Sequence, residues 1–218
     1  MAATTARPEQ RLRTPRAAGV VGIAFAVLLA AVIVLVRIVF PALPLTADEW
    51  HTSSSHREAL RWALALLPFA GIAFLWFMGA LRAYVGKAED KFVATVFLGS
   101  GLLFVATLFA LATSAGSMLD VTAARGGPSR LTLWQYGHHF TYTLLSSYSM
   151  RMAAVFTLST TTIGRLLGLF PRWLVWLGYL VGTVLLFVVV NVRWSELAFP
   201  FWVLMLSCHM LTSPRWSE

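Results

Sequence analysis

Arg151 is the most unusual charged residue in this chain, because it lies inside a strongly apolar stretch. If that stretch crosses a membrane, a guanidinium there is costly unless it reaches the lipid headgroups or binds an anionic group. Glu196 is the first candidate partner and Asp120 the second, because both fall toward the same predicted side of the membrane. Turned toward the protein interior, Arg151 could also hold a lipid phosphate or a substrate carboxylate. Snorkelling to the headgroups is the ordinary alternative.

Hydroxyl side chains follow Arg151 at close spacing: Thr157, Ser159, Thr160, Thr161 and Thr162. In a membrane helix such side chains usually donate to their own backbone or let neighbouring helices approach closely. Together they could instead line a polar path for a small solute. Packing is the interpretation that we favour, and Thr157, Thr160 and Thr161 remain candidates for a polar network.

Four histidines fall on one predicted side of the membrane: His51, His56, His138 and His139. Imidazoles from two segments could form an outer metal site, although their spacing is not diagnostic and loop histidines are usually solvated. His209 lies near the opposite end of its stretch, so it cannot share a haem with the others. No cofactor is expected.

Sequence motifs for catalysis are missing. The chain has no HExxH, GxSxG or Walker pattern, and no carboxylate pair lies within an apolar stretch. Ser146 or Ser147 near His138 or His139 is the one conceivable nucleophile and base, and nothing else supports it. The sequence therefore favours a protein without enzymatic activity.

The elements that carry these residues are long apolar stretches. The hydrophobic fraction is 58% and the mean hydropathy is +0.74, far above a soluble domain. About 20 apolar residues suffice for a helix to cross the hydrocarbon core. We predict an all-α, polytopic bundle in one transmembrane domain, residues 1–218, with spans at 17–40, 60–84, 92–115, 144–164, 172–192 and 196–213. The last is the weakest, because it is short and carries Pro200 near its start.

The segment at 131–149 leads into the fourth span, and its apolar residues recur at helical spacing with polar residues mostly between them. We predict a helix lying at the outer interface, or kinked there, with Phe140 and Leu144 turned toward apolar surroundings. The alternative is one long tilted helix that projects outward.

Basic residues predict the orientation. With the tail at 1–16 inside, the inner ends of the spans hold ten Lys and Arg residues and the outer ends six. We therefore expect a multi-pass protein of a bacterial inner membrane with both termini in the cytoplasm. The net charge of +8 is explained by these positions, so nucleic acid is not an expected partner.

A sequence run from Arg151 to Arg165, followed by Phe-Pro-Arg-Trp-Leu-Val-Trp-Leu-Gly-Tyr179, resembles a pattern in uncharacterised bacterial six-helix membrane proteins, as does the preceding Leu-Trp-Gln-Tyr-Gly. The resemblance covers the C-terminal half of the chain. It implies the six-helix layout and no activity.

The function class that these observations favour is a non-catalytic accessory or lipid-contacting bundle. A small-solute transporter with a polar path near Arg151 is the alternative, and a membrane redox or metal-binding protein is the third. Membrane lipids are the expected partners, with another membrane protein or a second copy of the chain also open.

Overall fold

The structure is a computed structural model, and it describes residues 14–39, 54–85, 91–123, 128–189, 192 and 194–212. Every regular element within these ranges is helical, which confirms the all-α prediction. The elements are α1 (Thr14–Val39), α3 (Ser54–Val85), α4 (Lys91–Ala123), α5 (Pro128–Thr143), the π-helix η2 (Leu144–Ser149), α6 (Met150–Leu166), α7 (Arg172–Phe187), the 3-10 turn η3 (Ser195–Leu197) and α8 (Ala198–Thr212).

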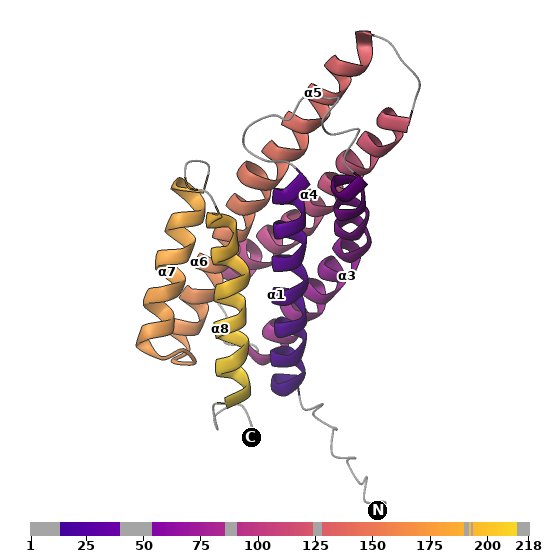
Figure 1. The fold of residues 1–218 in the computed structure, drawn as a ribbon. Helices are drawn as coiled ribbons and strands as arrows, with labels where there is room; N and C mark the ends of the chain where they lie inside the picture. The colour runs from indigo at the N-terminus through magenta and orange to yellow at the C-terminus, as the bar shows by residue number, and fades with distance from the viewer. Residues whose placement is uncertain are drawn as a thin grey trace, which may run out of the picture.

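The helices form an antiparallel bundle in which α1 packs between α3 and α8. On the other side, α4 contacts α3 and α6, and α7 lies between α6 and α8. The start of α1 and the end of α8 lie together at one end, here called the terminal end (Figure 1). We call the opposite end, from which α5 projects, the α5 end.

Phenylalanine rings fill the centre of the bundle. Phe74 of α3 lies 4.9 Å from Phe25 of α1, 5.0 Å from Phe104 of α4 and 4.9 Å from Phe156 of α6, measured between ring centroids. Phe199 of α8 completes the group at 5.2 Å from Phe104, and all five side chains are fully buried. Such ring pairs add about 0.5–1.5 kcal/mol each beyond the area that they bury.

Small residues bring particular helices into close contact. A Cβ atom at Gly22 of α1 would lie 2.1 Å from Ser207 Oγ of α8 and 2.8 Å from the Phe77 ring of α3. A Cβ atom at Gly178 of α7 would lie 2.1 Å from Thr161 Oγ1 of α6. Close approach through small residues is a common basis of helix association in membranes, where apolar burial against lipid gives little driving force.

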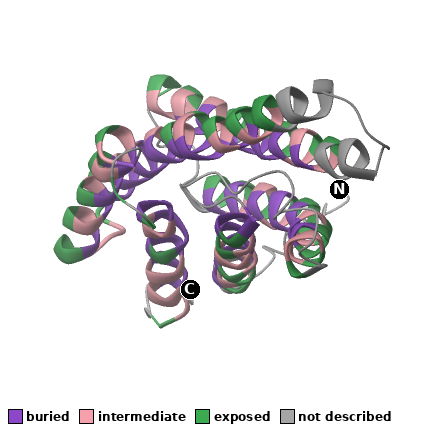
Figure 2. Ribbon diagram, turned by 45° about the horizontal axis from the view of Figure 1, so that its top comes forward, coloured by how far each residue is buried: buried purple, intermediate pink, exposed green. Residues whose placement is uncertain are grey.

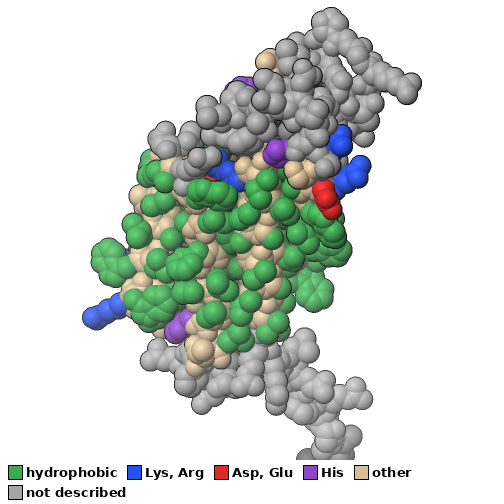
Figure 3. Space-filling model, in the orientation of Figure 1, with side chains coloured by type: hydrophobic (Ala, Val, Ile, Leu, Met, Phe, Trp, Pro, Cys, Tyr) green, Lys and Arg blue, Asp and Glu red, His purple; other side chains and the backbone are tan. Residues whose placement is uncertain are grey.

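Apolar side chains also cover the outside of the bundle. Figure 2 shows buried residues on the faces where the helices meet and exposed residues on the outer faces. In Figure 3 the exposed middle of one face is almost entirely hydrophobic, with charged side chains at its edges. This is the inverse of a soluble protein surface and fits a lipid environment.

Four helices are long and apolar enough to cross a membrane: Ala17–Val39, Ser55–Ala83, Lys91–Ser117 and Ser195–Thr212. They correspond to the first, second, third and sixth predicted spans, so the weakest prediction is also matched by a helix of sufficient length. The fifth corresponds to α7, a shorter apolar helix, and the fourth to α6. Both pack within the bundle beside the longer helices.

The segment at 131–149 is helical, as predicted, and it continues directly into α6 through η2. One rod therefore runs from α5 to α6 with a local change of helical pitch, and α5 extends past α1 and α8 (Figure 1). Leu144 packs against the core, whereas Phe140 is 45% exposed and stacks on Tyr136 at 5.9 Å. That this rod lies at a membrane interface stays a prediction.

Candidate functional site: a buried ion pair at the α5 end

A buried ion pair joins the first and last helices of the bundle. Arg37 lies in the last turn of α1, and its Nη2 donates to Oε1 of Glu196 in η3, just before α8. Their side chains are only 6% and 0% exposed. Each charge also lies at the helix end that favours it, the cation at a C-terminus and the anion at an N-terminus.

Tyr142 of α5 adds a third element to the pair. Arg37 Nη1 donates to the Tyr142 hydroxyl at 3.4 Å, and the guanidinium carbon lies 5.2 Å from the centroid of the tyrosine ring. Tyr142 therefore offers the cation a hydroxyl oxygen as hydrogen-bond acceptor and the π face of its ring. Through this cluster, α1, α5 and the start of α8 are held together at the α5 end.

The ion pair leaves two of its own polar atoms unused. Arg37 Nε and Glu196 Oε2 are buried and have no hydrogen-bond partner in the part of the chain that the structure describes. A buried group left in this way costs about 1–3 kcal/mol. Among the described residues, the ion pair thus holds one N–H donor and one carboxylate acceptor in reserve.

The loop before Glu196 is held in an uncommon conformation. Trp194 has φ of 70°, in the left-handed region that side chains other than glycine rarely adopt. The next residue stabilises the turn, because Ser195 Oγ donates to the backbone carbonyls of Val192 at 2.7 Å and Val189 at 3.1 Å. Strain of this kind often accompanies functional sites, and here it lies two residues before Glu196.

The π-helix η2 begins two residues after Tyr142. Segments of this kind are rare and occur frequently at functional sites. Ser146 Oγ donates to the carbonyl of Tyr142, four residues earlier, at 2.8 Å. Ser149, at the end of η2, is fully buried, and its hydroxyl has no partner among the residues described.

The predicted pairing of Arg151 with Glu196 is wrong. Glu196 is bound by Arg37, and Arg151 is exposed on α6. The physical reason is the helical register: Met150, Ala153 and Ala154 face the core, which turns Arg151 outward. The other candidate, Asp120, belongs to α4, and its side chain is outside the described part of the structure.

The threonines of α6 donate their hydroxyl hydrogens to carbonyls of their own helix. Thr157 Oγ1 donates to the Ala153 carbonyl at 2.8 Å, Thr160 to Phe156 at 2.7 Å and Thr161 to Thr157 at 2.7 Å. All three are buried, and their hydroxyl hydrogens are used within their own helix. These hydrogen bonds are the kind that the packing interpretation expects.

The histidines do not converge on a metal site in the described structure. His51 lies outside the described residues, and His56 lies on α3. His138 and His139 of α5 have ring centroids 6.0 Å apart, and burial, followed by the neighbouring His139, lowers the pKa of His138. Within the described ranges, no three His, Cys, Asp or Glu residues are grouped to hold an ion.

Sequence reasoning missed Arg37 as a site residue. It is the sole charge in the first apolar stretch, and that isolation was the available signal. Its partner could not be read from the sequence, because nothing local indicates that the first and last spans are neighbours. Fold and site together define a helical membrane bundle with a buried ion pair at one end. Comparison with protein-family models, with curated proteins and with solved structures finds no match to this chain.

Proposed function

We propose that this chain is a non-catalytic, lipid-contacting membrane bundle whose axis is closed by its phenylalanine core. The observation that carries this is the group of five fully buried rings contributed by α1, α3, α4, α6 and α8. An interior packed in this way has few voids larger than a water molecule and is hard to compress. A solute could therefore pass through it only if the rings were displaced at a large cost in free energy. The apolar outer faces of the same helices favour lipids as the main contacts, with a second copy or another membrane protein as further partners.

The test of a closed axis is solute permeability. Purified protein is reconstituted into liposomes, and the swelling rate in glycerol or urea and the decay of a proton gradient are followed by stopped flow. We expect both rates to equal those of protein-free liposomes. A rate above that level, abolished by Glu196→Gln, would overturn the proposal.

A second candidate is a small-solute carrier, and one observation favours it. Arg37 Nε and Glu196 Oε2 are both buried, and neither has a hydrogen-bond partner among the described residues of the cluster, whose Tyr142 lies two residues before the π-helix η2. A zwitterionic or amide-bearing solute could bind both atoms. The site would then lie at the α5 end, and Arg151 would have no part in it. Solute uptake that depends on Arg37 and Glu196 would favour this candidate over the first.

For location, we propose a bacterial inner membrane with both termini in the cytoplasm, in line with the resemblance to six-helix bacterial membrane proteins. The basic bias supports this orientation, and the terminal end carries Arg82, Lys91, Arg165 and Arg172. In a Cys208→Ser background, Thr14→Cys should resist an impermeant thiol reagent in intact cells and Ser54→Cys should react. The opposite pattern would invert the topology.

A further inference from the structure

An open hollow on α3 combines charge with apolar surface. It has a volume of about 580 Å³ and is lined by Arg57, Glu58, Arg61, Trp62 and Ala65. These residues occupy about two turns at the α5 end of the helix. Figure 3 shows charged side chains at the corresponding edge of the apolar surface, which is where lipid headgroups would meet the protein.

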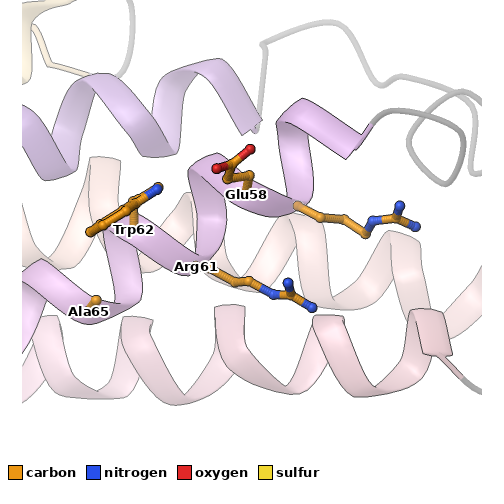
Figure 4. A pocket seen from close by; sticks show the side chains of 5 residues that line it. Glu58, Arg61, Trp62 and Ala65 are labelled. Carbon is orange, nitrogen blue, oxygen red and sulfur yellow. The ribbon is translucent and has the colours of Figure 1, made fainter.

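Charged side chains of opposite sign lie next to one another on this part of the helix but point in different directions. Arg57 and Arg61 are four residues apart and therefore share one face, as do Glu58 and Trp62. In Figure 4 the Glu58 carboxylate and the Trp62 ring lie on one side of α3, and the Arg61 side chain extends away from them. The hollow thus offers a cationic part and, beside it, an anionic part with an aromatic ring.

An exposed apolar stripe leads from the hollow along α3 toward the middle of the bundle. Its large members are Trp62 at 59% exposure, Phe69 at 63%, Ile72 at 50% and Trp76 at 69%. From Trp62 to Trp76 the helix rises about 21 Å, which is comparable to an extended acyl chain. Ala65 is the small residue between the first two rings, so a chain can leave the hollow there.

We propose that the hollow and the stripe, together called the α3 lipid site, bind one phospholipid whose headgroup carries a phosphate and a primary ammonium. Arg57 and Arg61 bind the phosphate, the Glu58 carboxylate accepts hydrogen bonds from the ammonium, and Trp62 presents its ring to that cation. An acyl chain lies along the stripe. This inference rests on the proposed lipid-contacting function and names its lipid class.

Charge complementarity distinguishes this lipid from the other common classes. A lipid with only negative charge would place its headgroup against the Glu58 carboxylate, which repels it. A trimethylated ammonium keeps the cation–π contact with Trp62 but has no N–H to donate to Glu58. A free phosphate uses the arginines alone and gains nothing from the stripe.

The test is native mass spectrometry of the delipidated protein, titrated with phosphatidylethanolamine, phosphatidylcholine and phosphatidylglycerol of identical acyl chains. We expect the wild type to prefer phosphatidylethanolamine over both others by about tenfold, the scale of one charge-assisted hydrogen bond. Arg57→Gln/Arg61→Gln should weaken that binding by about tenfold or more. Glu58→Gln should retain binding and remove the preference over phosphatidylcholine.

The matched control is Arg165→Gln/Arg172→Gln, which removes two exposed arginines at the terminal end and should leave the preference unchanged. If the arginine pair on α3 does not yield folded protein, Glu58→Gln decides by its selectivity alone. Equal binding of the three lipids by wild type, or full competition by free phosphoethanolamine, would overturn the α3 lipid site. Either result leaves the liposome permeability, and hence the closed-axis proposal, unaffected.

Discussion

At the scale of single residues, the position of a charge on its helix decides what it does. Arg37 and Arg151 both lie in apolar stretches, yet Arg37 is buried in an ion pair and Arg151 is exposed. A buried pair contributes little net stability compared with apolar residues of the same size, but breaking it leaves one charge unmatched. The pair therefore specifies that α1 and α8 are neighbours more than it strengthens the fold.

We expect Glu196→Gln to destabilise the protein by about 3–5 kcal/mol, because Arg37 would remain charged and buried without its counter-ion. The double variant Arg37→Met/Glu196→Leu should recover most of that loss, since no charge is then buried. Thermal unfolding in detergent measures both. Arg151→Gln is the control and should change stability by less than about 0.5 kcal/mol. If the double variant were as unstable as Glu196→Gln, the ion pair would contribute more free energy than is needed to offset the desolvation of its two charges.

A pH dependence is expected from His138. Its pKa is lowered first by burial and then by His139, so the folded protein binds this proton less readily than the unfolded chain does. Stability is therefore complete above the ordinary histidine pKa of 6.5 and decreases as the pH falls toward the lowered value. The melting temperature at pH 5 relative to pH 7.5 should fall less in His138→Gln than in wild type. An identical fall in both would contradict the assignment.

At the scale of the elements, close contacts between helices depend on a few glycines. Substituting alanine tests this, because the added Cβ atom would meet a neighbouring helix at some of these glycines and open space at others. Gly22→Ala should destabilise by about 1–3 kcal/mol, because the new Cβ meets Ser207 and the Phe77 ring. Gly178→Ala should do the same against Thr161. Gly99→Ala is the matched control, because nothing lies within 4 Å of a Cβ there and alanine favours the helix. Equal effects at Gly22 and Gly99 in unfolding measurements would rule out the packing argument.

The existence of the helices could be predicted from the sequence, because four of them are apolar runs long enough to cross a bilayer and α7 is a shorter apolar run. The continuity of α5 with α6 could be read only as one of two alternatives, since no breaker separates them and the length of the segment exceeds one straight span. The ion pair could not be predicted. Arg37 and Glu196 are separated by 159 positions, and only the packing of α1 against α8 brings them together.

At the scale of the whole molecule, six helical rods in the described structure are organised around one aromatic centre. Phe74 is its middle residue, with ring centroids of Phe25, Phe104, Phe156 and Phe199 between 4.9 and 6.3 Å away. Those partners belong to four different helices. The centre therefore couples the packing of nearly every helix, and in the proposed function it is also what closes the axis of the bundle to solutes.

Phe74→Ala tests both roles of this centre in one variant. Removing a fully buried ring should destabilise the protein by about 3–5 kcal/mol, because the surrounding rings relax only partly into the space. Phe74→Leu should lose about half as much, since it retains most of the apolar volume. In liposomes, neither variant should raise solute permeability, because the other four rings still block the axis at the same level. If Phe74→Ala lowered the melting temperature little but made the liposomes permeable to urea, the rings would be acting as a gate, and the bundle would have to be regarded as a channel held closed by its core.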